Sequence, residues 1–267
     1  MTEPHGVWVY AVGDDIATGR IEHLTGVGGG AVRGISAYGL TAVAGDVPLA
    51  EFGESALRRN LEDLAWLEAT ARAHHHVIDA LGQRASLVPM RLATVYASDD
   101  GVAAMLDERA ADFRAALSRI SSRQEWGVKA YAAQPPERGG FAASAPARSS
   151  GAAARPGAAY LQRRRDELSS RSQARSDLLA SAETIHARLS GLAAEVRLHA
   201  PQAPQLTGVR AQMILNAAYL VDDERSGEFA DAVAALAREH PAARLELTGP
   251  WPPYSFAGTP ERSPPCE

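Results

Sequence analysis

Three adjacent histidines, His74, His75 and His76, are the residues of this chain most suggestive of metal chemistry. Positions three or four apart share a face of a helix, so three neighbours diverge around it and cannot all bind one ion. His75 and Asp79 have the spacing of two ligands, but no third ligand accompanies them. His75 also falls on the apolar stripe of a predicted helix, where a hydrogen-bonded core histidine is the alternative. We therefore predict no metal site.

The glycine cluster Gly26–Gly30 is a candidate for a phosphate-binding loop. Such loops lead into a helix whose amino-terminal N–H groups hold the phosphate. Residues 32–35 instead have an extended pattern, and no lysine follows the glycines as a Walker-type loop requires. We predict a mobile loop and no bound nucleotide.

The nucleophilic side chains lack the partners that catalysis needs. Cys266 stands in a terminal Pro-Pro-Cys-Glu run with no scaffold to hold a base beside it. Residues 34–38, Gly-Ile-Ser-Ala-Tyr, lack the second glycine of a nucleophile elbow. The acid pairs Asp99-Asp100 and Asp222-Asp223 stand where helices are predicted to start, and the helix dipole favours acids there. The sequence predicts neither an enzyme nor a cofactor.

The composition is that of a folded protein with an uneven charge distribution. The 267 residues are 46% hydrophobic and 22% charged, with a net charge of −5 and one cysteine, so no internal disulfide can form. No apolar run approaches the ~20 residues of a membrane span, and the start lacks a secretory signal, so we expect a cytoplasmic protein without a membrane partner. Residues 1–134 carry a balance of −5, residues 135–175 of +5 and residues 176–267 of −5.

The amino-terminal half mixes strand and helix patterns. Strands are predicted over residues 7–12, 32–35 and 38–44, an extended segment over 87–96, and a further strand over 126–132. Helices are predicted along an apolar stripe from Leu57 to Ile78 and after a Ser98 cap, with the apolar face of the second ending at Ile120. Several hairpin signals among these elements favour an α+β fold over a parallel α/β sheet.

The carboxyl-terminal half begins with a long helix from Ala158 to about Leu192. Strands follow at 194–199, 212–221 and 244–249, with a helix that starts at Asp222 between the last two. The order helix, strand, strand, helix, strand predicts a small antiparallel sheet backed by helices in a ferredoxin-like arrangement. We divide the chain into an α+β domain at 1–134, a flexible Ala/Gly/Pro/Arg linker at 135–156 and an α+β domain at 157–267.

Two clusters are candidates for binding a partner. Arg163, Arg164 and Arg165 stand on the long helix, with Arg171 and Arg175 further along it. They form either a solvated face or a contact for an acidic protein, and the acidic flanking domains disfavour nucleic acid. Trp251, Tyr254 and Phe256 punctuate a Pro-rich tail, and these rings either pack on their own domain or contact a partner.

Several stretches together resemble the gas vesicle protein GvpF/GvpL family. They are the Trp-Val-Tyr-Ala-Val run at 8–12, Tyr-Gly-Leu-Thr-Ala-Val at 38–43, His-His-His-Val-Ile at 74–78, Leu-Val-Pro-Met-Arg-Leu-Ala-Thr-Val-Tyr at 87–96, Glu-Trp-Gly-Val-Lys-Ala-Tyr at 125–131, Gly-Ala-Ala-Tyr-Leu at 157–161 and Leu-Thr-Gly-Pro-Trp-Pro-Pro-Tyr-Ser-Phe at 247–256. The sequence departs from the family at Met90, where leucine is more usual, and at Ala93, where a small residue such as glycine is more usual. Its Ala/Arg/Pro linker is also unusually long. Which of GvpF and GvpL it resembles more stays open.

The resemblance implies a two-domain α+β protein of gas vesicle biogenesis that is not an enzyme. It implies a minor component or accessory protein that helps nucleate or assemble the vesicle shell. The implied partners are the shell protein GvpA and other gas vesicle accessory proteins. The alternative from another class is a ferredoxin-like small-molecule sensor or enzyme, which would need a deep pocket with convergent polar groups.

Overall fold

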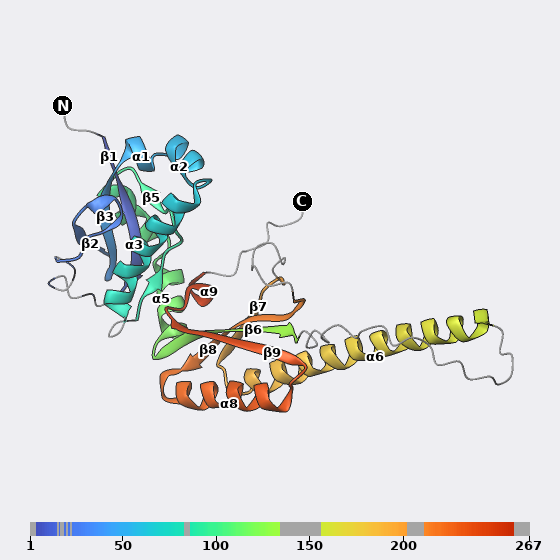
Figure 1. The fold of residues 1–267 in the computed structure, drawn as a ribbon. Coiled ribbons are helices and arrows are strands. Elements are labelled where there is room, and N and C mark those ends of the chain that lie inside the picture. Colours follow the sequence, from blue (N-terminus) through green and yellow to red (C-terminus); the bar gives the residue numbers. More distant parts are fainter. Residues whose placement is uncertain are drawn as a thin grey trace, which may run out of the picture. The chain divides into compact units, whose positions relative to one another are not determined.

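The computed structural model describes residues 4–14, 16, 19, 21, 23–82, 86–133, 156–201 and 211–258. The chain forms two compact units, drawn in Figure 1. The first comprises Met1–Trp126, Leu220–Asp223 and Gly249–Glu267, and the second comprises Gly127–Tyr219 and Glu224–Thr248. The linker predicted over 135–156 lies outside the described residues except for Pro156, and the predicted domain limits stay a prediction.

The first unit is built on an antiparallel sheet. Its strands are β1 (His5–Gly13), β2 (Val32–Ala37), β3 (Leu40–Pro48), β4 (Val88–Pro89) and β5 (Val95–Tyr96). Their order is β2-β3-β1-β4, and β5 also pairs with β1. The buried apolar run of β1 therefore lies centrally, as predicted. The predicted hairpin is also confirmed, since Tyr38 and Gly39, both at positive φ, form a two-residue turn between β2 and β3.

The α-helices that the structure describes before the second sheet are α1 (Leu49–Phe52), α2 (Glu54–Asn60), α3 (Leu64–Gly82), α4 (Asp99–Glu108) and α5 (Ala110–Ile120). The single helix predicted along 57–78 is therefore two helices. Asp63 begins the second of them, because its carboxylate accepts the N–H groups of Ala65 and Trp66 at 2.9 and 3.3 Å. The predicted Ser98 cap of α4 is confirmed, with the Gly101 N–H donating to its hydroxyl at 3.4 Å.

The core histidine is His74, not His75 as predicted. His74 is 3% exposed and stands between two groups of the core. Trp8 Nε1 donates to His74 Nδ1 at 2.9 Å, so the proton of the neutral ring is on Nε2, which donates to the Met90 carbonyl at 3.1 Å. The break between α2 and α3 shifts the apolar stripe by one position, which turns His75 toward the surface.

His74 makes the stability of the protein depend on pH. Burial lowers the pKa of His74 from 6.5 to about 4. The unfolded chain binds this proton first, so we expect stability to be full above pH ~6.5 and to fall, by on the order of 3 kcal/mol, as the pH drops toward 4. Denaturant unfolding across this range measures the slope. The glutamine amide in His74→Gln can still accept a hydrogen bond from Trp8 and donate one to the Met90 carbonyl. In this variant the part of the pH dependence of stability that comes from His74 should be absent. The same pH dependence in the variant and the wild-type chain would show that His74 is not its source.

Ala93 explains one departure from the family pattern. The extended segment predicted over 87–96 is interrupted by a turn, and Ala93 adopts φ +64° within it. A left-handed conformation costs an L-residue about 1–2 kcal/mol and costs glycine little. We expect Ala93→Gly to raise the free energy of unfolding by about 0.5–1 kcal/mol, after the entropy of the added glycine is deducted. Ala69→Gly, at an exposed position inside α3, should instead lower the free energy of unfolding by about 1 kcal/mol. Denaturant unfolding measures both variants, and a lower stability in Ala93→Gly as well as in Ala69→Gly would refute the strain at Ala93.

The glycine cluster is a packed turn rather than the mobile loop predicted. The Val27 N–H donates to the Tyr10 hydroxyl at 2.7 Å, and the Gly26 N–H donates to the Gly30 carbonyl at 2.8 Å. A Cβ at Gly26 would lie 2.1 Å from that hydroxyl, so close packing requires glycine here. Burial raises the pKa of Tyr10 to about 12. The chain then enters β2, as predicted, and not a phosphate-binding helix.

The second sheet confirms the ferredoxin-like prediction and adds a strand to it. The elements in chain order are β6 (Arg123–Ala132), α6 (Pro156–Ser190), β7 (Glu195–Leu198), β8 (Met213–Asp222), the 3-10 turn η3 (Asp223–Arg225), α8 (Ser226–Glu239) and β9 (Ala243–Trp251). The strand order β7-β8-β6-β9 with this βαββαβ sequence is the ferredoxin-like topology. The strand predicted over 126–132 is its first strand, so the predicted three-strand sheet has four.

The carboxyl-terminal half of α6 supplies the core of the second unit. Ile185 and Leu189 are fully buried, and α6 contacts α8, whose Phe229 is also fully buried. His186 Nδ1 lies 2.9 Å from the Tyr219 hydroxyl, and the Tyr219 ring packs on Phe229 at 5.4 Å between centroids. Among the helices that the structure describes, none has both the length and the apolar content needed to cross a bilayer.

Candidate functional site

A groove of about 550 Å³ lies in the first unit beside the Pro-rich tail. The tail runs from the end of β9 into the short helix α9 (Tyr254–Ala257). Polar and charged side chains line the groove together with apolar ones, and the polar atoms contribute the larger part of its exposed surface. The lining residues are Ile78, Asp79, Ser86, Leu87, Ile120, Ser122, Arg123, Gln124, Asp223, Pro250, Trp251, Pro252 and Pro253. The groove thus combines an aromatic and proline wall with carboxylates.

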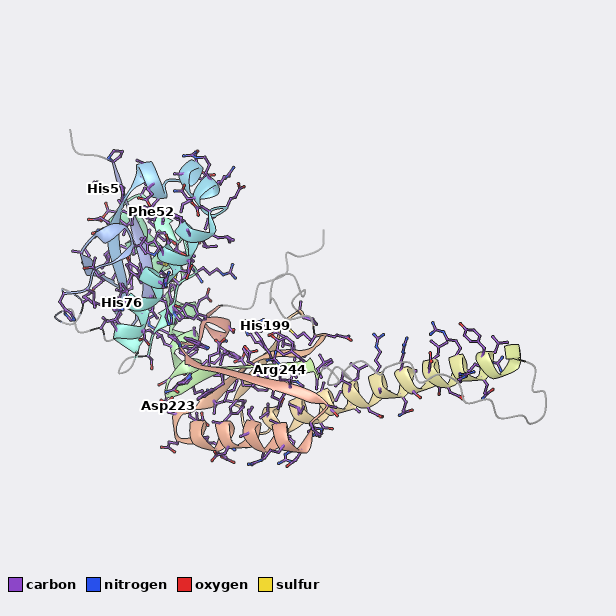
Figure 2. All side chains as sticks on the ribbon, in the orientation of Figure 1. His5, Phe52, His76, His199, Asp223 and Arg244 are labelled. Carbon is purple, nitrogen blue, oxygen red and sulfur yellow. The ribbon has the colours of Figure 1, made fainter. Side chains whose placement is uncertain are left out.

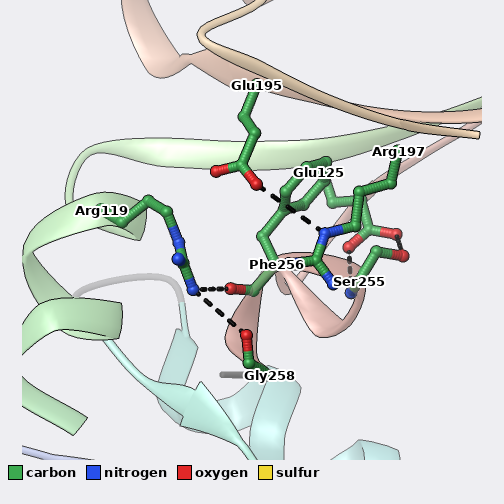
Figure 3. A network of polar contacts seen from close by, with 7 residues as sticks. All are labelled: Arg119, Glu125, Glu195, Arg197, Ser255, Phe256 and Gly258. Atoms are coloured by element: carbon green, nitrogen blue, oxygen red, sulfur yellow. Dashed lines mark hydrogen bonds and ion pairs between the residues drawn. The ribbon is translucent and has the colours of Figure 1, made fainter. Parts of the chain in front are cut away.

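The tail is fixed in place by one buried ring and two polar residues. Phe256 is 0% exposed. Arg119 donates to the Phe256 carbonyl at 2.5 Å and to the Gly258 carbonyl at 3.3 Å (Figure 3). The Glu125 carboxylate accepts the Ser255 N–H at 2.7 Å and the Ser255 hydroxyl at 2.6 Å. Charge-assisted hydrogen bonds of this kind are about twice as strong as neutral ones, so the tail is held at both ends of α9.

The turn into the tail requires glycine. Gly249 has φ +113°, and a Cβ there would lie 2.8 Å from the Glu125 carbonyl oxygen. Any side chain would therefore meet backbone atoms that cannot move aside. The Thr-Gly-Pro-Trp run owes its glycine to this close approach.

Two of the three aromatic residues that the sequence offers as candidates for partner contact lie at the surface. Trp251 is 45% exposed and Tyr254 is 37% exposed. His75 contacts both, since its ring centroid is 5.7 Å from that of Trp251 and 6.1 Å from that of Tyr254, and its Nδ1 is 3.3 Å from the Tyr254 hydroxyl. Burial, together with the carboxylates of Asp79 and Glu125, raises the pKa of Tyr254 to about 12, so the phenol is neutral at physiological pH. We call Trp251 and Tyr254 the aromatic surface.

Phe256 differs from its two neighbours. The structure places its ring entirely inside the unit, as in the alternative in which the tail packs on its own domain. A ring with no exposed area contacts no partner directly in this conformation. Phe256 instead anchors the segment that presents Trp251 and Tyr254.

The charges of the groove are acidic in balance. Arg123 Nε forms an ion pair with Asp222 at 2.8 Å, and the same guanidinium donates to the Arg119 carbonyl at 2.6 Å. Asp79 and Asp223 contribute further carboxylates to the wall. Burial raises the pKa of Asp223, labelled in Figure 2, and the neighbouring charge of Asp222 raises it further. The groove therefore suits a neutral or basic segment rather than an acidic one.

The arginine cluster belongs to the other unit. Arg163, Arg164 and Arg165 are exposed residues of α6 in the second unit. Being neighbours, they diverge around the helix and do not form a single patch. Arg164 pairs with Glu167 at 3.2 Å. The structure therefore keeps the two predicted clusters in separate units, and whether either binds a partner stays a proposal.

Sequence patterns did not identify the other residues of this site. Asp79, Arg123 and Asp223 come from three distant segments, and His75 was expected in the core. The signal that could have placed His75 correctly was the helix start at Asp63. Counting the apolar positions from that residue turns His75 away from the core. Among the described residues, no group of three or more histidine, cysteine or acidic side chains is arranged to hold a metal ion.

Comparison with known sequences identifies the family. A family model described as "Gas vesicle synthesis protein GvpL/GvpF" matches residues 6–258. The chain is similar to gas vesicle protein L of Streptomyces sp. (strain CB03234), with 41% identity over 254 residues that cover 95% of this chain and 93% of the relative. It is also similar to gas vesicle protein F of the same strain, with 27% identity over 209 residues, 73% of this chain and 80% of the relative.

Solved structures show the same fold. The crystal structure of gas vesicle protein GvpF from Anabaena sp. PCC7120 superposes with a TM-score of 0.65 at 21% identity, covering 96% of this chain and 98% of that one. GvpF from Microcystis aeruginosa gives a TM-score of 0.64 at 18% identity, covering 95% and 99%. The match of the family model over nearly the whole length and the 41% identity to a curated relative show that this chain belongs to the GvpL/GvpF family of gas vesicle proteins.

Proposed function

We propose that this chain is a non-enzymatic accessory protein that helps nucleate or assemble the gas vesicle shell in the cytoplasm. Its partners in this role are the shell protein GvpA and other gas vesicle accessory proteins. The observation that carries the proposal is the aromatic surface, in which Trp251 and Tyr254 are held half-exposed by the buried Phe256 beside the groove. Half-exposed aromatic residues on a fixed backbone are typical of the centres of protein interfaces.

The physical task of such a factor fits this surface. A shell subunit exposes apolar area until it is incorporated, and exposed apolar area drives aggregation. An assembly factor must cover that area reversibly, so its own surface must be partly apolar and already ordered. Arg119 and Glu125 order the tail before any partner arrives, which lowers the entropic cost of binding.

Co-precipitation with the shell protein and the other accessory proteins, in parallel with a deletion strain, tests the proposal. We expect binding to the shell protein and a loss of vesicles on deletion that a plasmid copy restores. Normal vesicles in the deletion strain, together with no binding to any vesicle protein, would refute the assembly role.

A small-molecule sensor or enzyme is the second candidate, and the groove is the observation that favours it. Its volume of about 550 Å³ is within the range of ligand pockets, and Asp223 has a raised pKa. We prefer protein docking because Arg123 is already paired with Asp222 and the wall includes a half-exposed tryptophan. A thermal-shift screen with metabolites separates the two: a ligand whose stabilisation disappears in Asp223→Asn would favour the sensor.

A further inference from the structure

The projecting half of α6 carries an unpartnered face with a regular pattern. Residues 160–177 are all exposed, a length of about 27 Å of helix. Figure 1 shows this half of α6 extending past the sheet of its own unit. Three local side-chain pairs support it: Gln162 with Asp166, Arg164 with Glu167, and Gln173 with Asp177. Pairs of this kind stabilise a solvent-exposed helix by a few tenths of a kcal/mol each.

The face continues the stripe by which α6 packs on its own unit. Leu178, Ala182, Ile185 and Leu189 are the inward positions of the packed half, at alternating steps of four, three and four. Extending the same steps backward along the projecting half reaches five residues, which we call the Leu-Arg face: Leu161, Arg164, Leu168, Arg171 and Arg175. These steps are those of a coiled-coil seam.

Leucines at the seam of a fully exposed helix indicate a missing partner. Leu161 and Leu168, one heptad apart, are 59% and 52% exposed. The arginine stems can cover neighbouring apolar area while their guanidinium groups stay at the rim. The ion pair between Arg164 of the face and Glu167 joins two exposed groups and contributes little, so a partner can displace it.

The charge of the face selects the partner. Arg164, Arg171 and Arg175 lie on the seam and Arg165 beside it, against one flanking acid, Glu167. The other acids of this half, Asp166 and Asp177, fall at outer heptad positions. A second copy of the chain would set these arginines against one another, so self-pairing is disfavoured. An acidic helix is favoured instead.

We propose that the Leu-Arg face docks an acidic amphipathic helix of another protein in coiled-coil fashion. Leucines of the partner would pack against Leu161 and Leu168, and its flanking glutamates would pair with the seam arginines. This inference goes beyond the proposed function, because it uses no residue of the groove or of the aromatic surface. It gives the chain a second interface, suited to linking an assembly factor to a helical protein.

A defined peptide tests the docking. The probe is a labelled 21-residue peptide of three heptads with leucine at both seam positions and glutamate at both flanking positions, whose charge opposes self-association. The control peptide has the same composition in an order that puts the leucines on no common face. By fluorescence anisotropy with the full chain, we expect the heptad peptide to bind at least tenfold more tightly than the scrambled one.

Matched variants separate a seam from general charge attraction. Leu161→Ser with Leu168→Ser should remove the preference for the heptad peptide, and Arg171→Glu on the seam should weaken binding several-fold more than Arg163→Glu at an outer position. Equal binding of the two peptides would overturn the proposal. RNA that binds the chain more tightly than the heptad peptide does, with an affinity that depends on the arginines and not on the leucines, would also overturn it. So would self-association of the chain that the Leu161→Ser, Leu168→Ser variant abolishes. Shell-protein binding measured on the same variants should stay unchanged, so a failure here is distinguishable from a failure of the assembly role.

Discussion

Phe256→Ala lowers the free energy of unfolding by about 3–5 kcal/mol, the expected cost of deleting a fully buried phenylalanine ring. The loss comes from the removed apolar contacts and from the cavity that remains under α9. Denaturant unfolding measures this loss. If the alanine variant fails to fold, Phe256→Leu, for which we expect a smaller loss of stability, is measured in its place.

Tyr254→Phe is the matched control for this loss. It retains the ring and removes only a hydroxyl that lies 3.3 Å from His75 Nδ1 at an exposed position, so we expect a change within about 0.5 kcal/mol. A Phe256→Ala variant as stable as the parent would show that the ring is not the anchor of the tail.

The combined substitution Trp251→Ala and Tyr254→Ala has the largest expected effect on function. Aromatic residues at the centre of an interface each contribute about 2 kcal/mol or more to binding, so removing both should weaken shell-protein affinity by several hundredfold, which is about 4 kcal/mol. Surface plasmon resonance with immobilised shell protein measures the affinity. Because both side chains are more than half buried, the variant is compared with the wild-type chain at a temperature where circular dichroism shows both to be folded.

Tyr160→Ala provides the matched control for the aromatic surface. Tyr160 is 65% exposed on α6, in the second unit, and should be dispensable for shell binding. Equal losses in the two variants would indicate nonspecific adsorption of aromatic side chains, and no loss in either would show that the shell protein binds elsewhere.

The sequence was informative where local patterns decide the structure. The alternation and apolar content of residues 7–12 and 212–221 predicted buried strands, and the Ser98 cap predicted the start of α4. It was less informative where distant segments decide. The first strand of the second sheet, β6, pairs between β8 and β9, whose residues lie roughly 80 or more positions later, and no local pattern specifies that pairing.

The candidate site illustrates the same distinction. Its aromatic residues stood out by composition, but whether each ring packs inward or outward depends on contacts with Arg119 and Glu125, more than 100 positions away. The histidine error has a similar origin. One position on a helix is about 100° of rotation, so a helix start missed at Asp63 was enough to exchange His74 and His75.

The most direct test of the central claim is a sedimentation assay of the shell protein diluted from denaturant into buffer that contains this chain. If the aromatic surface covers the apolar area of unassembled shell protein, the wild-type chain keeps the shell protein in the supernatant in proportion to its concentration, and the Trp251→Ala, Tyr254→Ala chain leaves it in the pellet. Equal protection by the two chains, or pelleting in the presence of both, would contradict the account.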